Sequence, residues 1–380
     1  MVITHVLSSI DNKGGGPSRS CTQLIEELSR IRPDYSIQLL TKITDDPFLN
    51  SFKNQNAEIY NLSYDKLGRL EDFKGVVNTI KSSIFHGHGI WQLPVHQMAS
   101  YSRMNKIPYL ISPRGMLEPW SLKQKRLKKN VALKLYQRLD LEKANCIHAT
   151  SELEAKSIRK LGLNNPIAII PNGIPLQYPI SEFDKVENGR REILFLSRIH
   201  PKKGIENLIQ AWSMIPESER KEWKVNVVGN GQENYIKSLK NLVKENNLQS
   251  SIDFSPPIYG AKKQELFNRA EIFVLPTYTE NFGIVVTESL ASGTPVITTK
   301  GAPWHDLEIY NCGWWIDIGV LPLFKVLRES IKLPKEDLKS MGINGRKLIE
   351  SKYDISITGN QMARLYEWLE RDDPKPDFVV

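Results

Sequence analysis

The chain has 380 residues and a formal net charge of +8, with 40% hydrophobic and 25% charged residues. This length allows two to three domains, of which we expect two, and the composition of an ordinary globular protein excludes a disordered or fibrous chain. The positive charge favours anionic partners without choosing among nucleic acid, acidic lipid and phosphorylated small molecules.

The cysteines and the apolar segments of the sequence indicate in which cellular compartment the protein is expected. Cys21, Cys146 and Cys312 are far apart, so we expect neither a disulfide framework nor a zinc site, and a reducing cytoplasm fits. The chain does not open with a basic segment and a long apolar stretch, and it has no window of about 18 apolar residues. We therefore expect a cytoplasmic protein without signal peptide or spanning helix.

Apolar strands alternate with amphipathic helices through the chain, which predicts an α/β fold with parallel sheets covered by helices on both faces. In the first half, a strand at 2–7 precedes a glycine loop at 14–16 and a helix at 18–31. Further strands are expected at 36–40, 84–85, 109–111, 146–149 and 168–170. We expect 1–171 to form one doubly wound domain.

The basic segment 123–138 interleaves lysine and arginine with leucine and valine. Such an amphipathic helix suits the surface of an anionic bilayer, and a solvated helix face is the alternative that the pattern leaves open. Aromatic residues are not interleaved with the basic run, and no helix-turn-helix, RNP-like or zinc-finger pattern occurs. We expect no nucleic-acid partner.

A turn-rich stretch at 172–190 is predicted to link the first domain to a second one at 191–353. The second domain has expected strands at 192–197, 224–228, 252–254, 272–275 and 296–298, with helices at 204–215, 233–246 and 262–270. A last helix is predicted at 356–370, within a C-terminal segment at 354–370. Residues 371–380 are expected to fray.

Glu280 and Glu288 frame the most informative motif, which runs from the loop after the strand 272–275 into the following helix. Glu280 falls in the loop and Glu288 in the helix. The amides of Phe282, Gly283 and Ile284 are expected at the helix N-terminus, where unpaired N–H groups favour an anion. A nucleotide-sugar, with a charged middle and hydroxyl-rich ends, suits this layout.

The motif resembles the signature of glycosyltransferase family 4, which is retaining and has the GT-B fold. The match covers Asn281-Phe-Gly283, Glu288-Ser-Leu-Ala-Ser-Gly293 and Pro295-Val. The resemblance implies two Rossmann-like domains that face each other across a cleft, with the acceptor on the N-terminal side and the last helix returning to that side. It also implies that Glu280 holds the donor sugar and Glu288 the nucleotide ribose.

Two basic residues follow the strand 192–197, where open α/β sheets bind ligands. Arg198 and Lys203 can neutralise a departing diphosphate, since a guanidinium grips two phosphate oxygens and an ammonium adds a compact charge. Their positions match the family's motif, which implies a catalytic role. A solvated basic loop is the alternative.

Other loops give weaker signals. The resemblance places the glycine loop with Gly15 and Gly16 near donor phosphates, and Gly229 is a candidate to wall the nucleotide base, although ordinary turns explain all three. It also implies that His88 acts near the sugar. His86 and Arg114 are acceptor-side candidates, and the one-residue spacing of the two histidines argues against a metal site.

Together these features predict a retaining, metal-independent glycosyltransferase that needs no cofactor. It would move a hexose-type sugar from a nucleoside diphosphate to a saccharide or a lipid-linked saccharide. The Gly301-Ala-Pro-Trp304 and Cys312-Gly-Trp-Trp315 motifs resemble those of bacterial surface-polysaccharide enzymes, which implies capsule, O-antigen or exopolysaccharide synthesis and a location at the inner face of the plasma membrane. The alternatives are a catalytically silent nucleotide-sugar or polysaccharide binder and a phosphorylase of the same fold.

Overall fold

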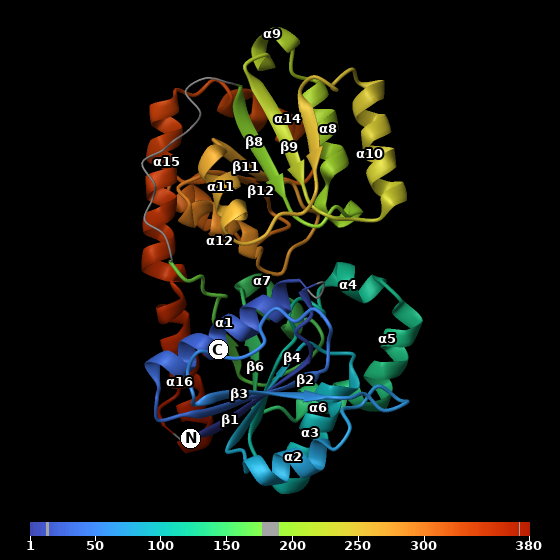
Figure 1. The fold of residues 1–380 in the computed structure, drawn as a ribbon, viewed down its shortest axis with the longest axis vertical. Helices are drawn as coiled ribbons and strands as arrows, with labels where there is room; N and C mark the ends of the chain where they lie inside the picture. Colours follow the sequence, from blue (N-terminus) through green and yellow to red (C-terminus); the bar gives the residue numbers. More distant parts are fainter. Residues whose placement is uncertain (13–14, 177–189, 372) are drawn as a thin grey trace. The chain divides into compact units, whose positions relative to one another are not determined.

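The computed structural model describes residues 1–12, 15–176, 190–371 and 373–380, and the chain divides into two compact units. The first unit comprises Met1–Pro175 with Asp354–Val380, and the second comprises Leu176–Tyr353. Each is a parallel sheet with helices on both faces (Figure 1). This is the α/β architecture that the alternation of strands and helices predicts. Most of the expected linker at 172–190 lies outside the described residues.

The first unit has a seven-stranded sheet in the order β3-β2-β1-β4-β5-β6-β7. Its strands are β1 (Val2–Ser9), β2 (Ser36–Lys42), β3 (Ala57–Leu62), β4 (Ile84–His88), β5 (Tyr109–Ser112), β6 (Cys146–Ala149) and β7 (Ile167–Ile169). Its helices are α1 (Gly16–Ile31), α2 (Phe73–Ile80), α3 (Leu93–Asn105), α4 (Pro119–Lys123), α5 (Arg126–Ala132), the π-helical turn η2 (Leu133–Gln137), α6 (Arg138–Glu142), α7 (Glu152–Arg159) and α16 (Ile355–Arg371).

The two faces of this sheet have separate apolar cores. Alternate residues of the strands point to opposite faces, so Ile3 and Leu7 of β1 pack under α1 and α16, while Val6 faces the other way. The first core includes Ile25 of α1 and Leu365 of α16, which explains why the C-terminal helix belongs to this unit although it is far away in sequence.

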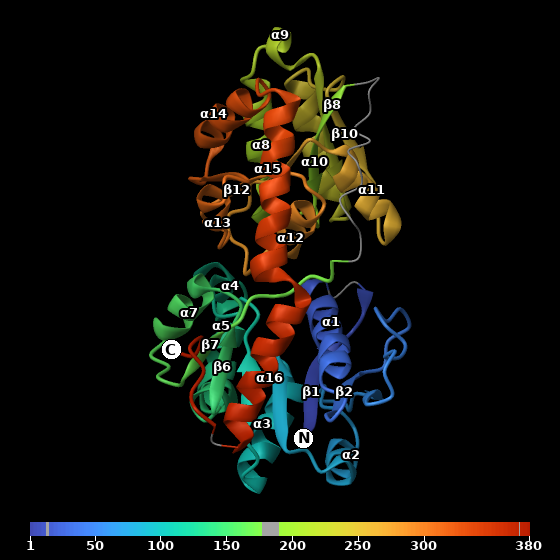
Figure 2. The ribbon, with the colours of Figure 1, turned by 90° about the vertical axis from the view of Figure 1, so that its left-hand side faces the viewer.

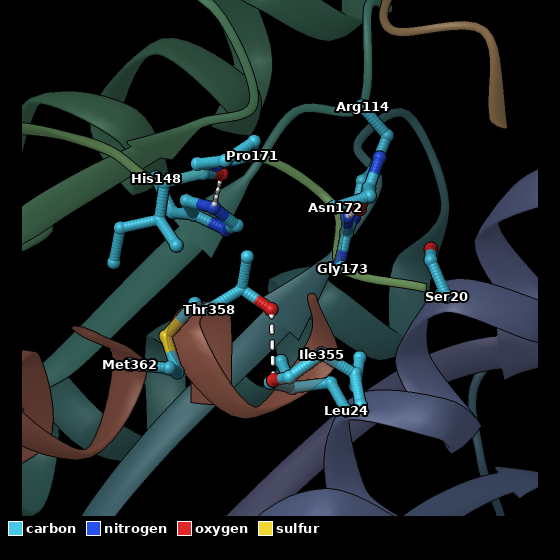
Figure 3. Close-up of a pocket in the computed structure, with 11 residues that line it drawn as sticks. Ser20, Leu24, Arg114, His148, Pro171, Asn172, Gly173, Ile355, Thr358 and Met362 are labelled. Carbon is cyan, nitrogen blue, oxygen red and sulfur yellow. Dashed lines mark hydrogen bonds between the residues drawn. The ribbon is translucent and has the colours of Figure 1, made fainter. Parts of the chain in front are cut away.

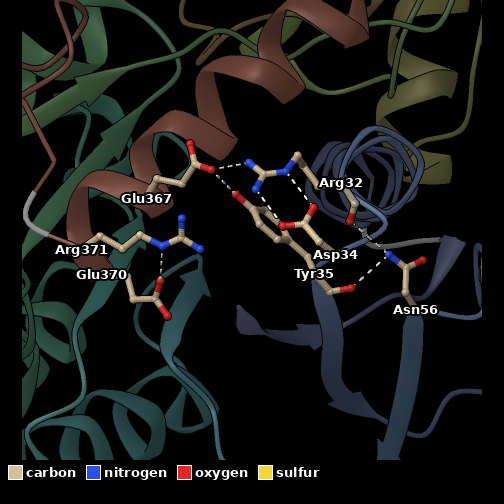
Figure 4. A network of polar contacts seen from close by, with 7 residues as sticks. All are labelled: Arg32, Asp34, Tyr35, Asn56, Glu367, Glu370 and Arg371. Atoms are coloured by element: carbon tan, nitrogen blue, oxygen red, sulfur yellow. Dashed lines mark hydrogen bonds and ion pairs between the residues drawn. The ribbon is translucent and has the colours of Figure 1, made fainter.

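Helix α16 lies beside α1 (Figure 2). A polar network at its C-terminal half joins it to the turn after α1 (Figure 4). Glu367 accepts a hydrogen bond of 3.1 Å from the Tyr35 hydroxyl and forms an ion pair with Arg32, whose Nη2 lies 2.8 Å from Asp34. Because the charged groups Arg32, Asp34 and Glu367 are partly or largely exposed, the network orients α16 more than it stabilises the unit.

The end of the chain differs from its expected fraying. The Val380 amide donates a 2.9 Å hydrogen bond to the Ile167 carbonyl, and the Ile167 amide donates one of the same length to Val380. Val379 is buried in the core beneath α1. The expectation of a frayed tail was therefore wrong for residues 378–380, because the edge strand β7 offers unpaired backbone groups, and Val379 forms an antiparallel bridge with Ala168.

The second unit has a six-stranded sheet in the order β10-β9-β8-β11-β12-β13. Its strands are β8 (Arg191–Leu196), β9 (Trp223–Val228), β10 (Ile252–Ser255), β11 (Ile272–Leu275), β12 (Val296–Thr299) and β13 (Gly313–Ile316). Its helices are η3 (Pro201–Lys203), α8 (Ile205–Ser213), α9 (Glu217–Arg220), α10 (Glu233–Glu245), α11 (Ala261–Arg269), α12 (Ile284–Ala291), α13 (Asp306–Ile309), α14 (Val320–Ser330), α15 (Lys335–Leu348) and the π-helical turn η4 (Ile349–Tyr353).

The structure adds one strand to each expected sheet. β3 and β13 were not predicted, and both lie at a sheet edge. β3 is half polar, and three of the four residues of β13 are only partly buried, so neither has the fully buried pattern of the central strands. The pairing with β2 and β12, rather than local sequence, makes them strands.

Candidate functional site

Two loops of the second unit meet at the carboxyl ends of β8 and β11, the middle strands of the sheet. The loop after β8 carries Arg198 and Lys203, and the loop after β11 carries Glu280. The Tyr278 amide donates a 2.8 Å hydrogen bond to the Lys202 carbonyl, which ties the loops together. Strand order thus brings together residues about 80 positions apart, at the edge where parallel sheets bind ligands.

Glu280 and Lys203 form an ion pair through Oε2 and Nζ, and neither side chain is more than 17% exposed. Burial opposes ionisation of Glu280, but the charges of Lys203, Lys202 and Arg198 outweigh it and hold the pKa of Glu280 below its usual value. Glu280 is therefore a carboxylate at neutral pH, able to accept hydrogen bonds from hydroxyl groups. Lys203 itself is fixed at the end of the 3-10 turn η3.

Arg198 differs from Lys203 in its surroundings. Its side chain is exposed, and within the described part of the chain it forms no hydrogen bond or ion pair. Its charge still acts on Glu280, which places the guanidinium in the field of this site. Arg198 is thus a cation that an anionic ligand can reach without breaking an existing contact.

Glu288 lies inside α12, where the sequence motif predicts it, and is buried. Its Oε2 pairs with Nζ of Lys263 on α11 at 2.5 Å. Sequence reasoning did not single out Lys263, because its link to Glu288 depends on how α11 and α12 pack. The site therefore holds two lysine–glutamate pairs, one at each end of the motif.

The N-terminus of α12 lies between these pairs. Gly283 is the N-cap residue with φ of 85°, and no side chain caps the helix or places an acid in its first turn. A Cβ at this position would meet Cγ of Glu280 at 3.2 Å, so glycine serves both the turn and the close approach. The first amides of such a helix attract an anion.

Phe282 is part of the core rather than of an open surface. Its ring packs on Trp304 and Tyr353, with ring centroids 5.3 and 5.8 Å away, and its carbonyl accepts a hydrogen bond of 2.5 Å from Trp304 Nε1. Only the backbone of Phe282 is thus offered to a ligand, together with that of Ile284 at the helix start. Trp304 belongs to a motif noted in the sequence, and its role here is to hold the loop.

Gly229 follows β9 and has a structural reason to be glycine. A Cβ there would lie 1.9 Å from the Ser197 carbonyl oxygen, so only glycine lets the loops after β9 and β8 approach so closely. Its contact with a nucleotide stays a prediction.

The first unit gathers four histidines on one face of its sheet. His5 lies on β1, His86 and His88 on β4, and His148 on β6, and each is at most 2% exposed. Burial lowers the pKa of His5 and His148 to about 3, and it lowers the pKa of His86 and His88 well below the usual value, with the Arg114 charge acting in the same direction on all four. All four rings are therefore neutral near pH 7.

His88 was expected to act near the sugar, yet both of its ring nitrogens are already hydrogen-bonded. Nε2 lies 2.9 Å from Nδ1 of His5, and Nδ1 lies 2.9 Å from Nη2 of Arg114. His86 likewise bonds Tyr366 and Ser112, at 2.7 and 2.6 Å. In this structure both histidines lie behind the surface, and Arg114 is the partly exposed member of the group.

His5, His86 and His88 are also a set in which one ring nitrogen of each residue lies within 4.8 Å of those of the other two. All six nitrogens take part in hydrogen bonds, and a dication would lie next to the Arg114 guanidinium. This donor set does not fit a metal ion without loss of those bonds.

The glycine loop after β1 is described in part. Gly15 is the N-cap residue of α1 with φ of 75°, and Gly16 begins the helix. Lys13 and Gly14 lie outside the described residues. Gly15 thus fits a sharp entry into the helix, and a contact with donor phosphates stays a prediction.

Comparison with known families covers nearly the whole chain. Residues 14–178 match Glycosyltransferase Family 4, and residues 179–347 match Glycosyl transferases group 1. The capsular polysaccharide biosynthesis glycosyltransferase CapM of Staphylococcus aureus is 30% identical over 192 residues, which are 49% of this chain and 48% of CapM. The chain thus matches about half the length of this curated relative.

Solved structures of the same fold match at low identity. Sucrose-phosphate synthase from Thermosynechococcus elongatus aligns with a TM-score of 0.79 and 19% identity, over 97% of this chain and 99% of that one. HepE of Anabaena, solved in complex with UDP and glucose, aligns with a TM-score of 0.76 and 18% identity over 97% and 100%. These matches confirm the predicted GT-B fold.

Proposed function

Because the chain belongs to the family 4 glycosyltransferases, we propose that it transfers a hexose-type sugar from a nucleoside diphosphate donor to a saccharide hydroxyl, with retention of configuration. The observation that carries the proposal is the meeting of Arg198, Lys203 and Glu280 beside the uncapped N-terminus of α12. This arrangement offers two cations and free amides to a diphosphate, and a carboxylate to the sugar.

Binding of the donor would exchange one ion pair for several contacts. Lys203 would move its charge from Glu280 to a phosphate oxygen, and Glu280 would accept hydrogen bonds from sugar hydroxyls. Glu288, held by Lys263, would accept hydrogen bonds from the ribose. Beside Lys203, Lys202 and Arg198, Glu280 is already a carboxylate before the donor arrives, because these charges hold its pKa below the usual value.

The chemical step follows from the same charges. As the bond between sugar and diphosphate breaks, negative charge grows on the leaving oxygen, and Arg198, Lys203 and the α12 amides stabilise it. The acceptor hydroxyl oxygen then bonds to the anomeric carbon from the face that the diphosphate leaves and gives its proton to the leaving oxygen, which retains the configuration. This scheme uses neither a metal ion nor a cofactor, since the protein supplies the positive charge.

We propose a bacterial surface polysaccharide, such as capsule, O-antigen or exopolysaccharide, as the product, with a saccharide or lipid-linked saccharide as acceptor. The name of the relative CapM supports capsular polysaccharide, and the UDP and glucose bound by HepE support a nucleotide-hexose. Transfer would take place in the cytoplasm.

We also propose peripheral contact with an anionic membrane through the basic segment 123–138 and the helical turn that continues from it to Glu142. Leu127, Val131, Leu135 and Leu139 are exposed and four residues apart along continuous helical turns, and Leu127 is 83% exposed. Lysines and arginines of the segment flank this stripe, which suits acidic head groups. Among the described residues, no helix combines the length and the apolar content needed to cross a bilayer.

The deciding experiment incubates the full chain with a panel of nucleoside diphosphate sugars and candidate acceptors, with mass spectrometry of the products. A glycosylated acceptor with released nucleoside diphosphate supports the proposal. Release of sugar phosphate would indicate a phosphorylase. Binding that raises the melting temperature without turnover would indicate a silent binder.

A further inference from the structure

The histidines of the first unit interrupt an otherwise apolar face of the sheet. His5 is directly opposite His86 in the β1–β4 register, and His88 is opposite Ser112 of β5. Alternation keeps His86 and His88 on one face of β4, under α16, which adds Tyr366. The neighbouring residues of this face, including Ile3, Ile84 and Leu110, are buried and apolar. Such a buried polar group persists only if its members satisfy one another.

The direction of the hydrogen bonds is fixed from one end by a backbone carbonyl. The Ile170 carbonyl can only accept, so His148 Nε2, at 2.8 Å, must carry a hydrogen. Nδ1 of the neutral His148 then accepts from the Ser112 hydroxyl at 2.7 Å. Ser112 in turn accepts from Nε2 of His86 at 2.6 Å, which leaves Nδ1 of His86 to accept from the Tyr366 hydroxyl at 2.7 Å.

The other end is fixed independently by a guanidinium. Arg114 can only donate, so Nδ1 of His88 accepts from its Nη2 at 2.9 Å. Nε2 of His88 then donates to Nδ1 of His5 at 2.9 Å, which leaves the hydrogen of His5 on Nε2. Nε2 of His5 lies 3.5 Å from the Tyr366 hydroxyl oxygen, which is the longest hydrogen bond of this series.

The series of hydrogen bonds traced from Ile170 and the one traced from Arg114 meet at the Tyr366 hydroxyl, and the donors and acceptors that each requires there agree. Tyr366 donates to His86 and can accept from His5, so all four rings carry their hydrogen on Nε2 and all are neutral. The rings of His86 and His88 have centroids only 4.0 Å apart, a spacing that two charged rings would not tolerate. The series of hydrogen bonds ends at the buried backbone carbonyl of Ile170, which cannot pass a proton on. The series therefore cannot conduct protons.

Among the residues that the structure describes, Arg114 is thereby held only by neutral acceptors. Its second partner is Oδ1 of Asn172 at 2.8 Å, and its Nε is buried without a partner in the described part of the chain. The nearby carboxylate, Glu154, is bound to the backbone of Gly115 and Thr150. Arg114 also has φ of 56°, a conformation that is uncommon outside glycine and is often found at functional sites.

A small cavity beside Arg114 does not supply a counterion. It is lined by Arg114, His148, Asn172, Thr358 and Ser20 (Figure 3), and its volume of about 10 Å³ is close to the space needed for one water molecule. An anion that pairs with Arg114 must therefore approach its partly exposed side.

We propose that this hydrogen-bond network is a lock with two halves. The half that begins at Ile170 fixes the tautomers of His148 and His86, and the half that runs from Tyr366 through His5 and His88 positions Arg114 as a cationic binding group for an oxyanion of the acceptor, a phosphate or a carboxylate. His88 and His5 are positioning residues in this scheme, and Tyr366 joins them to α16. That the oxyanion belongs to an acceptor rests on the proposed function, whereas the lock and the binding of an anion do not.

The tautomers are tested by nitrogen-15 NMR of the histidine rings in the full chain. We expect His5, His86, His88 and His148 to show the neutral Nε2–H form between pH 5.5 and 8. A hydrogen on Nδ1 of any of the four, or titration of one of them in this range, would overturn the lock.

Anion binding is tested in a chain that also carries Arg198→Ala and Lys203→Ala, so that phosphate does not bind at that loop of the second unit. The probe is the Nε–H signal of Arg114, assigned by its absence in Arg114→Lys, during titration with inorganic phosphate and, separately, acetate. We expect a saturable change in the chemical shift of this signal. Tighter binding of phosphate would identify a phosphate group of the ligand, and tighter binding of acetate would identify a carboxylate. No shift, or an equal one with chloride, would overturn the site.

Two matched variants test the positioning role. His88→Leu removes the acceptor of Arg114 and should weaken phosphate binding about tenfold, whereas His88→Asn keeps a side-chain oxygen there and should recover part of it. Ser112→Ala breaks the hydrogen bonds between His148 and His86. It should change the phosphate affinity by no more than about twofold, because Arg114 itself fixes the hydrogen bonds of His88 and His5. Equal effects of His88→Leu and Ser112→Ala would contradict the proposal. No donor is present, so the result does not depend on whether the chain transfers sugar.

Discussion

His5 and His88 are 83 residues apart in the chain, yet Nδ1 of the first lies 2.9 Å from Nε2 of the second. The two rings are nearly parallel, at 10° to each other, and both are buried. A bond between two imidazoles in the core requires both to be neutral or the pair to share a proton, and burial selects the neutral form. This has a direct consequence for stability in acid.

The first prediction is a steep loss of stability below pH 6.5. The unfolded chain binds a proton at each of the four buried histidines near pH 6.5, whereas the folded chain does so only near pH 3 for His5 and His148. Stability is therefore complete above pH 6.5 and falls as the pH drops toward 3, by about 1.4 kcal/mol per pH unit for each histidine. Four histidines give about 5.5 kcal/mol per pH unit, comparable with the whole stability of a small domain.

Hydrogen exchange of the β4 amides measures this loss in the first unit alone. His5→Asn keeps an acceptor for His88 and removes one titrating group, so its slope with pH should be about one quarter smaller. A stability that is constant between pH 7 and 5 would show that these histidines titrate in the fold with the same pKa as in the unfolded chain, and would contradict the prediction.

The second prediction concerns Glu280 and Arg198. Glu280→Gln and Arg198→Ala should each lower the transfer rate about a hundredfold or more, because each removes a charge that acts on the donor or the leaving group. Glu265→Gln and Lys237→Ala change exposed charges on α11 and α10 and serve as matched controls. Steady-state kinetics with a verified donor provides the measurement, and full activity in either site variant would remove the assigned role.

The third prediction separates stability from donor binding at Lys263. Lys263→Met leaves Glu288 buried without this partner and should cost about 3 kcal/mol of unfolding free energy. Adding Glu288→Gln should recover most of that stability but not the affinity for the donor, because the ribose contact is still missing. Urea denaturation and donor KM provide the two measurements. A double variant with the KM of the unmodified chain would show that Glu288 does not hold the ribose.

The fourth prediction is that metal removal has no effect. Arg198, Lys203 and helix amides supply the charge that a metal ion would otherwise bring to the diphosphate. Turnover in excess EDTA should therefore equal turnover without it, with an enzyme that requires magnesium assayed in parallel. Loss of activity that Mg²⁺ or Mn²⁺ restores would contradict the proposed mechanism.

The fifth prediction concerns the apolar stripe of α5 and the turns that follow. The full chain should float with liposomes that contain acidic lipids and not with neutral ones. Leu127→Glu and Leu135→Glu should reduce flotation about tenfold or more, since each removes an apolar side chain and adds repulsion. Leu321→Glu on α14 is the control, because Leu321 is exposed on the second unit. Equal recovery with both lipid types, or with neither, would contradict membrane contact.

The sequence allowed the α/β class, the family and the position of most central strands to be predicted. Central parallel strands such as β8 and β11 are short apolar runs, and the Glu280–Glu288 motif marks a loop and a helix start by local chemistry alone. The edge strands β3 and β13 were missed because their pairing partners, not their own residues, define them. The tail at 371–380 was expected to fray for the same reason, since its bonds to β7 are non-local.

Some residues of the candidate site could likewise be predicted from the sequence, and others only from the structure. Glu280, Glu288, Arg198 and Lys203 were predicted from residue type and spacing, because each motif lies within about a dozen residues of chain. Lys263, His5, Ser112, His148 and Tyr366 were not, although a histidine within an otherwise apolar strand was a signal available for His5 and His148.

The sequence by itself determined which groups can carry charge, which turns need glycine and which strands are buried, since these depend on neighbouring residues. Only the tertiary structure decided that Lys203 pairs with Glu280, that Lys263 pairs with Glu288, and that four histidines form one chain ending at Arg114. The reason is physical: strand order and helix packing set those distances, and neither is encoded in any one segment.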